Sequence, residues 1–300
     1  MSPERVSSMR RVPVVSLVAL SLLSACASVP TTPGAAPAAA QSPSPDDSLN
    51  ATVWFQTAVE RDLVFREIYR AAGERLDAAL ADKRWDALPT GDRGNDPRTL
   101  PPAVIVDVDE TVLDNSPSQV RQIRSGSEFN EAAWGAWVQQ RAAKPLPGAL
   151  EFLRSAAAKG ITVFYISNRD ASLAGATVDN LRQAGFPIDR DEQFLGLGSF
   201  VEGCEQEGSE KACRRQLVGR RYRVLMQFGD QVGDFVQVVA NTRDGRRAAI
   251  APYGDWIGER WWVLPNPVYG AWEPALFDNA WQQSREVRRA AKEAALDDAR

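Results

Sequence analysis

The sequence predicts an α/β protein built on a doubly wound parallel sheet. Three short runs of mainly apolar residues, at 104–107, 161–166 and 224–228, have the length and composition of buried strands. Segments with helical spacing of apolar residues lie between them, and this alternation is typical of a parallel sheet with helices on both faces. Ligands in such sheets bind at the carboxyl ends of the strands, so we expect the functional site at that edge.

The remaining elements follow from periodicity and from helix-ending residues. Residues 51–83 carry apolar side chains at roughly helical spacing, and Gly160 and Gly185 end two further helical segments. In chain order, the sequence predicts one or two helices at 51–83, a loop at 89–102, a strand at 104–107, an inserted helical cap at about 115–145, a helix at 147–159, a strand at 161–166, a helix at 173–184, strands at 224–228 and 248–250, and a terminal amphipathic helix at 274–300.

The composition excludes several kinds of chemistry. With 300 residues, the chain is long enough for one large core with additions or for two small domains. Its formal charge of -4 argues against a basic surface for nucleic-acid polymers. It has no histidine, which excludes His-ligated zinc and His-based acid–base pairs. Any reaction must therefore use carboxylates, lysine, arginine or hydroxyl groups.

The N-terminus has the pattern of a lipoprotein export signal. Arginines precede an apolar run at 12–23 that is too short to span a membrane as a mature helix. The run ends in Leu-Ser-Ala-Cys26, which is similar to a bacterial lipobox, although an ordinary signal peptide with a chance cysteine fits the same residues. We expect 1–25 to be a signal peptide, 26–50 a lipidated cysteine and flexible Ala/Pro/Ser linker, and 51–300 the folded domain. This arrangement predicts a periplasm-facing outer-membrane lipoprotein that contacts the membrane through its lipid anchor only.

Two cysteines follow Cys26, and they lie close together in a polar segment. An oxidising compartment favours a disulfide between Cys204 and Cys213. Two free thiols are the alternative, because the sequence does not fix the separation of the Cα atoms.

Polar residues follow each of the three main predicted strands. Asp107 and Asp109 come at the end of the first strand, Ser167 follows the second, and Asp230 follows the third. Residues i and i+2 of an extended chain point the same way, so the first two aspartates would project into one pocket. Paired carboxylates there are costly unless they hold a cation or attack an electrophile. The alternatives are a structural cap or simple ion site for the aspartates and an ordinary strand-end hydroxyl for Ser167.

Longer motifs narrow the assignment. DVDETVLDNSP, FYISNR, AKPLPGALEFL, GDQVGDF and LPNPVYGAWEPAL all occur between Trp54 and Leu276. Together they resemble the class C (DDDD-type) acid phosphatases of the haloacid dehalogenase (HAD) superfamily, which include the lipoprotein e-like 5′-nucleotidases. The resemblance implies a HAD-like doubly wound parallel sheet with helices on both faces and a small, mainly helical cap.

The resemblance also implies roles for the acidic residues. Asp107 would be the nucleophile that forms an aspartyl-phosphate, and Asp109 would protonate the leaving oxygen. Asp109 must then start protonated, which crowding by the other carboxylates favours, so we expect a mildly acidic pH optimum. One Mg²⁺ per site would be bound by Asp107, the Asp109 backbone carbonyl and Asp230, with Asp234 in support.

Two further residues would bind the phosphate. Ser167 would donate a hydrogen bond to a phosphoryl oxygen, and Lys211 is the best candidate for the cation that pairs with nucleophile and phosphate. Several arginines lie near Lys211 in the sequence, and a solvated lysine in a charged loop is the alternative. The family typically has asparagine or threonine at the place of Gln231 and often an aromatic at that of Ser118; both departures bear on substrate preference rather than on the chemistry.

The expected function is that of a metal-dependent acid phosphatase acting on 5′-nucleotides and aryl phosphates. In the related 5′-nucleotidases, aromatic residues at the positions of Trp134 and Tyr269 stack on the base, and packing of the cap on the core is the alternative role for both. Small phosphomonoesters such as nucleoside monophosphates are the expected partners, and no nucleic-acid polymer is expected. A phosphotransferase with the same phosphoenzyme and a non-catalytic periplasmic ligand-binding lipoprotein are the rival functions. The sequence leaves the oligomeric state open, with a dimer as one option.

Overall fold

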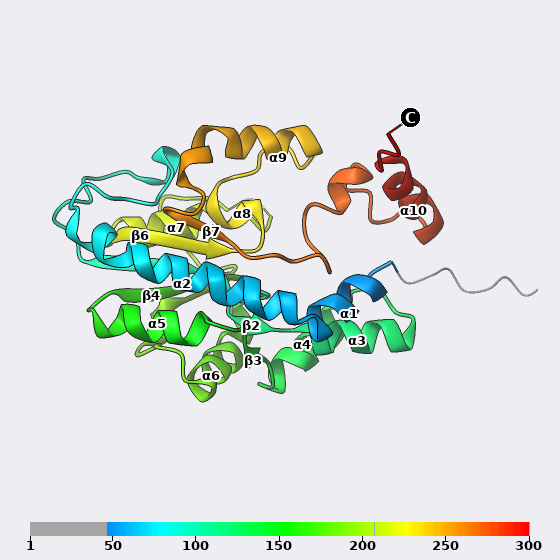
Figure 1. The fold of residues 1–300 in the computed structure, drawn as a ribbon, viewed down its shortest axis with the longest axis horizontal. Helices are drawn as coiled ribbons and strands as arrows, with labels where there is room; N and C mark the ends of the chain where they lie inside the picture. The colour runs from blue at the N-terminus through cyan, green and yellow to red at the C-terminus, as the bar shows by residue number, and fades with distance from the viewer. Residues whose placement is uncertain (1–46, 207, 300) are drawn as a thin grey trace, which may run out of the picture. The chain divides into compact units, whose positions relative to one another are not determined.

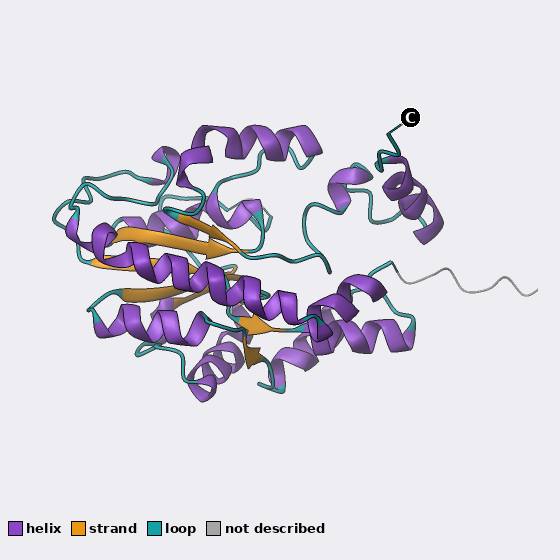
Figure 2. Ribbon diagram, viewed as in Figure 1, coloured by secondary structure: helices purple, strands orange, loops and turns teal. Residues whose placement is uncertain are grey.

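A computed structural model describes residues 47–206 and 208–299 and confirms the predicted parallel sheet. Five strands lie in the order β5-β4-β1-β6-β7, and every neighbouring pair is parallel (Figures 1 and 2). The strands are β1 (Pro102–Val106), β4 (Thr162–Asp170), β5 (Phe194–Leu197), β6 (Arg223–Gly229) and β7 (Trp261–Val263). Because β1 is central, its carboxyl end is flanked by the carboxyl ends of β4 and β6.

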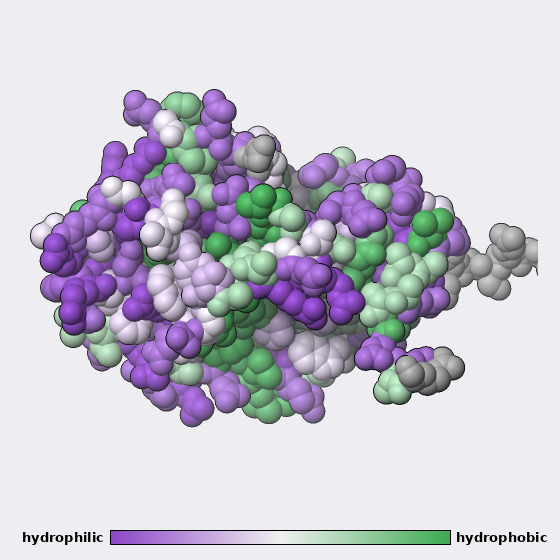
Figure 3. All heavy atoms as spheres, turned by 90° about the horizontal axis from the view of Figure 1, so that it is seen from above, coloured by the Kyte–Doolittle hydropathy of each residue, from purple (hydrophilic) through white to green (hydrophobic). Residues whose placement is uncertain are grey.

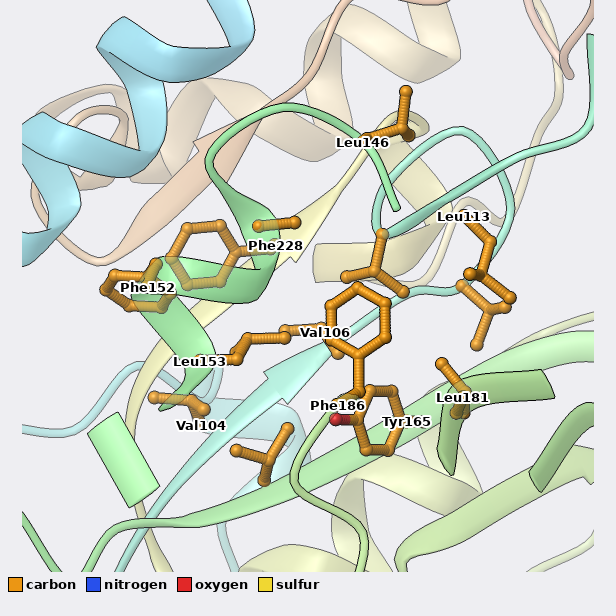
Figure 4. Close-up of a cluster of buried hydrophobic side chains, with 14 of the residues drawn as sticks. Val104, Val106, Leu113, Leu146, Phe152, Leu153, Tyr165, Leu181, Phe186 and Phe228 are labelled. Atoms are coloured by element: carbon orange, nitrogen blue, oxygen red, sulfur yellow. The ribbon is translucent and has the colours of Figure 1, made fainter. Parts of the chain in front are cut away.

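The residues of β1 alternate between two apolar clusters, one on each face of the sheet. Val104 and Val106 pack into the first cluster, together with Phe228 of β6 (Figure 4). Ala103 and Ile105 pack into the second. Burial of both faces explains why this strand reads as a continuous apolar run.

Helices cover both faces. The helices that contribute to the first cluster are α1 (Leu49–Thr57), α2 (Val59–Ala81), α4 (Glu131–Gln139), α5 (Ala149–Ala158) and α6 (Ala174–Ala184). The second cluster is covered by α7 (Ala212–Gly219), α8 (Val232–Phe235) and α9 (Arg243–Ile250). The surface in Figure 3 carries mainly hydrophilic side chains with hydrophobic ones between them.

The insertion that follows β1 is helical, as predicted. It contains β2 (Leu113–Asp114), α3 (Ser116–Ser125), α4 (Glu131–Gln139) and β3 (Lys144–Pro145), and β2 pairs with β3 in antiparallel fashion. The side chain of Asn130 caps α4 by accepting a hydrogen bond from the Ala133 N–H. The short β2–β3 pair closes the insertion at its base, which keeps α3 and α4 beside the end of β1.

Two predicted elements are wrong, each for a local reason. Residues 248–250 belong to α9 and not to a strand, because Thr242 caps a helix that continues through them. The helix predicted at 274–300 is interrupted: Pro274–Leu276 form a 3₁₀ turn, and α10 spans only Arg285–Ala294. Asp278 and Asn279 between them have positive φ angles of 53° and 60°, which a right-handed helix does not accommodate.

Residues 1–46 lie outside the described part of the chain. The signal peptide at 1–25, the lipidation of Cys26 and most of the 26–50 linker therefore stay predictions. α1 begins at Leu49, just inside the predicted linker. In the described part, no helix is both long and apolar enough to cross a bilayer.

Candidate active site

The carboxyl ends of the central strands border a cavity of about 830 Å³. Its lining includes Asp107, Asp109, Lys211, Asp230 and Asp234, so the fold brings together the charged residues that the sequence predicts for one site. The lining continues over residues of α3 and α4 and reaches α10.

Lys211 is buried in the site and directly precedes α7. Its ammonium nitrogen lies 2.5 Å from Asp107 Oδ1 and 2.7 Å from Asp234 Oδ1, and it donates to the Ile166 carbonyl at 2.8 Å. Three acceptors therefore match its three N–H donors. Burial lowers the pKa of Lys211, but the two carboxylates outweigh this effect and hold the pKa above its ordinary value. Lys211 is thus a paired, buried lysine and not a solvated one.

Three carboxylates converge beside this lysine. Oxygens of Asp107, Asp230 and Asp234 lie within 4.8 Å of one another. Burial raises the pKa of Asp107 to about 7; Lys211 opposes the rise, whereas Asp234 and Asp109 add to it. Burial, Asp234 and Asp107 also raise the pKa of Asp230 well above its ordinary value. One ammonium group therefore does not fully offset the repulsion among these buried carboxylates.

This donor set fits a divalent cation. Mg²⁺ prefers carboxylate oxygens, and a cation near the three converging groups would relieve their repulsion. The expected ligands Asp107 and Asp230 are both in the cluster, and the structure places the Asp234 side chain there as well. A Cβ on Gly229 would collide with the Asp234 side chain, so this close approach requires glycine at the end of β6.

Asp109 has a different set of partners. Arg169 Nε and Nη2 lie 2.9 and 2.8 Å from Asp109 Oδ1, and Asn115 Nδ2 donates to the same oxygen at 2.8 Å. Arg169 also donates to Asn115 Oδ1 at 3.1 Å, and the indole N–H of Trp137 in α4 donates to that oxygen at 2.8 Å. Crowding by other carboxylates was the expected environment of Asp109. The structure adds a direct ion pair between Asp109 and Arg169. This network joins the cap to Asp109.

Ser167 is fully buried and, among the described residues, is not part of the cavity lining. Its hydroxyl donates to Asp109 Oδ2 at 3.3 Å and accepts from the Arg169 N–H at 3.0 Å. Arg214 fixes this strand end by donating to the Ser167 carbonyl at 2.5 Å and to Asn168 Oδ1 at 2.8 Å. The hydroxyl would have to turn away from Asp109 to bind a phosphate.

The loop after β1 is held in an uncommon conformation. Glu110 has a φ of 56°, in the left-handed region, and its buried carboxylate accepts hydrogen bonds from the Asn115 N–H and the Tyr269 hydroxyl. Thr111 Oγ1 donates to Asp107 Oδ2 at 3.2 Å. These contacts fix the loop and orient Asp107.

The two candidate stacking residues both line the cavity. The Arg169 guanidinium lies 5.5 Å from the ring centroid of Trp134, and Gln231 Nε2 donates both to Asp230 and to the Tyr269 carbonyl. Trp134 and Tyr269 are half-buried and also pack against the first apolar cluster. Each ring therefore takes part in packing while bordering the site.

The predicted disulfide is present. Cys204 and Cys213 are bridged, with their Cα atoms 5.6 Å apart. The bridge closes the loop that contains Lys211 and fastens it to the first turn of α7.

No role was predicted from the sequence for Arg169 or Arg214, although each holds a site residue in place. Both are fully or almost fully buried. The available signal was the position of Arg169 inside a strand-end motif, since a charged side chain there must find a buried partner.

Comparison with known proteins gives concordant results. The model of the family described as "HAD superfamily, subfamily IIIB (Acid phosphatase)" matches residues 17–272. The structure of the class C acid phosphatase from Bacillus anthracis is similar, with a TM-score of 0.71 and 31% identity over 83% of this chain and 96% of that chain. A second structure of that protein, with tungstate bound, gives a TM-score of 0.72.

Two plant proteins are also similar over part of their length. Acid phosphatase 1 of Solanum lycopersicum is 28% identical over 192 residues, and the stem 31 kDa glycoprotein of Glycine max is 28% identical over 166 residues. The matched regions cover 63% and 55% of this chain and span 66% and 58% of those two relatives.

Proposed function

Because this chain belongs to the acid phosphatases of HAD subfamily IIIB, we propose that it is a metal-dependent phosphomonoesterase that acts through Asp107. The observation that carries the proposal is the arrangement at the carboxyl end of β1. Asp107 is paired with Lys211, Asp109 is paired with Arg169, and both aspartates line one cavity. One carboxylate is thus available for attack on phosphorus and the other for proton transfer.

In the first step, an Asp107 carboxylate oxygen forms a bond to phosphorus while the bond from phosphorus to the ester oxygen breaks. This step requires Asp109 to carry a proton in place of its ion pair with Arg169, and Asp109 gives that proton to the leaving oxygen. In the second step, water attacks the phosphorus of the aspartyl-phosphate, Asp109 takes a proton from the water, and the bond to Asp107 breaks. Lys211 stabilises negative charge on Asp107 and on the phosphoryl group.

Asp107, Asp230 and Asp234 would hold one Mg²⁺, with the Asp109 carbonyl as a further ligand. When bound, the ion supplies charge neutralisation for the phosphoryl oxygens. Asp230 is oriented for this role by Asn266 Nδ2 at 2.7 Å and Gln231 Nε2 at 2.9 Å.

We further propose that the substrates are 5′-nucleotides and aryl phosphates. Support comes from Trp134 and Tyr269 on the cavity wall, because aromatic rings stack on any base or aryl group. The export signal and lipobox support placement of the enzyme on the outer membrane, facing the periplasm and anchored through Cys26.

Phosphate release from adenosine 5′-monophosphate and from 4-nitrophenyl phosphate tests the proposal. We expect turnover by the full-length chain in detergent that requires Mg²⁺, is lost with chelator and is lost in Asp107→Asn. Asp244→Asn is the matched control, because that aspartate is 95% exposed and lies on α9, away from the cavity lining. Full turnover by Asp107→Asn would refute the assignment of the nucleophile, and no turnover by the folded native chain would favour a binding protein.

A further inference from the structure

The cavity extends from the carboxylates to the C-terminal helix α10. Four cationic residues of α10, spaced i, i+3, i+4 and i+7, lie on one helical face, and all four line the cavity. This α10 basic face consists of Arg285, Arg288, Arg289 and Lys292. The family model matches residues only up to 272, so the helix lies beyond the matched region.

Two of the four carboxylates that pair with the α10 basic face are each shared between two cations. Glu128 accepts from Arg285 at 3.1 Å and also pairs with Arg288. Asp47 likewise pairs with both Arg289 and Lys292, and Glu273 and Glu293 each pair with one of these two. A guanidinium has five N–H donors, so one shared carboxylate oxygen leaves donors of both arginines for another anion.

Among the residues that the structure describes, Arg288 has an N–H donor that no acceptor satisfies. It is only 6% exposed, yet its buried Nε has no hydrogen-bond partner in the described part of the chain. A buried guanidinium N–H without an acceptor is costly, and an anionic ligand in the cavity would supply the acceptor.

Exposed aromatic rings lie in the same part of the cavity. Phe129 and Trp281 are 59% and 51% exposed, and both line it. The Arg288 guanidinium lies 5.2 Å from the ring centroid of Trp281. Aromatic faces next to arginines are typical of sites that bind a nucleotide base together with its phosphate.

We propose that the α10 basic face binds a second phosphate group of the substrate, while the phosphate to be hydrolysed lies at Asp107. This inference rests on the proposed phosphatase function and narrows its substrate class to nucleotides with two phosphate groups. The second group is either a phosphomonoester on the same ribose or a phosphodiester that links a second nucleoside. A cavity of about 830 Å³ is at the large end of ligand sites, which leaves room for more than a nucleoside monophosphate.

The test compares kcat/KM of the full-length chain for release of the 5′-phosphate from three substrates. These are adenosine 5′-monophosphate, adenosine 3′,5′-bisphosphate and a 5′-phosphorylated adenylyl dinucleotide. We expect kcat/KM to be about tenfold higher for at least one of the last two, as one or two additional charged hydrogen bonds give. Preference for the bisphosphate identifies a monoester as the second group, and preference for the dinucleotide identifies a diester.

Two variants separate anion binding from simple docking of α10. Arg288→Gln removes a donor to the second phosphate. We therefore expect the ratio of kcat/KM for the preferred two-phosphate substrate to kcat/KM for adenosine 5′-monophosphate to fall towards one. Glu128→Gln removes the competing carboxylate and keeps the cations, so we expect the preference to rise. Arg84→Gln is the control, because Arg84 is highly exposed and lies outside the cavity lining.

Equal kcat/KM for all three substrates would overturn this inference and leave the proposed function standing. A fall in the preference for the two-phosphate substrate in both Arg288→Gln and Glu128→Gln would also overturn this inference. That result would show that the Arg288–Glu128 ion pair only docks α10. No phosphate release from any substrate would refute the proposed function, and the inference with it.

Discussion

Replacement of Lys211 by methionine tests whether the buried lysine is required to hold the carboxylates together. Methionine has a similar length but no charge, so the change leaves Asp107 and Asp234 buried without the cation that now lies 2.5 and 2.7 Å from their oxygens. Removal of one partner from a buried ion pair costs about 3–5 kcal/mol in free energy of unfolding. For a chain of roughly this size, 3 kcal/mol corresponds to a fall of about 6–12 °C in Tm.

The assay is thermal unfolding at pH 7 with chelator present, so that no added cation replaces the lysine. Lys159→Met is the matched control, because Lys159 pairs with Asp77 at a similar distance of 2.6 Å but at the surface. An exposed pair contributes about 0–1 kcal/mol, so the control should change Tm by only a few degrees. Equal effects of the two substitutions would refute the argument that burial makes the Lys211 pairs important.

Three further perturbations have definite expected results. Reduction of the Cys204–Cys213 disulfide should lower the free energy of unfolding by about 2.5 kcal/mol, as measured by calorimetry with and without reductant. Reduction should also slow phosphate release, because the bridge fixes the loop before α7. Gly229→Ala should destabilise the protein by about 1–3 kcal/mol and weaken Mg²⁺ binding by calorimetry, because the added Cβ collides with Asp234; unchanged Mg²⁺ affinity would contradict this account. Burial would raise the pKa of Glu128, but hydrogen bonds from two α10 arginines outweigh burial and lower that pKa. The ionised Glu128 side chain therefore stabilises the fold at pH values above the ordinary pKa of glutamate. This stabilisation is lost as pH falls through the lower pKa of the folded state. Glu128→Gln should therefore be less stable than the native chain at pH 7, and the difference should shrink as pH falls below the ordinary pKa of glutamate, as measured by thermal unfolding.

The sheet could be predicted because its strands are buried on both faces. Apolar runs at 104–107, 161–166 and 224–228 all correspond to strands, with β4 continuing to Asp170. The strands β5 and β7 were not predicted, since Phe194–Leu197 and Trp261–Val263 are too short to give a period. The run at 248–250 was misassigned for the same reason.

The carboxylates of the site could be predicted because strand ends place them at one edge of the sheet. Their protonation and partners could not, because these depend on residues that are distant in sequence. Arg169 lies 60 residues from Asp109, with which it forms an ion pair, and Lys211 lies 104 residues from Asp107. The position of the α10 basic face in the cavity wall likewise depends on the break in the chain before α10, which the continuous amphipathic pattern did not indicate.

The covalent step at Asp107 is the centre of this account, and trapping the phosphoenzyme tests it most directly. The native chain would be mixed with an aryl phosphate and Mg²⁺, quenched in acid within milliseconds, digested and analysed by mass spectrometry. We predict one phosphoryl group on the peptide that contains Asp107 in the native chain and none in Asp107→Asn. Turnover with no phosphorylated peptide, or a phosphoryl group on a different residue, would contradict the proposed mechanism.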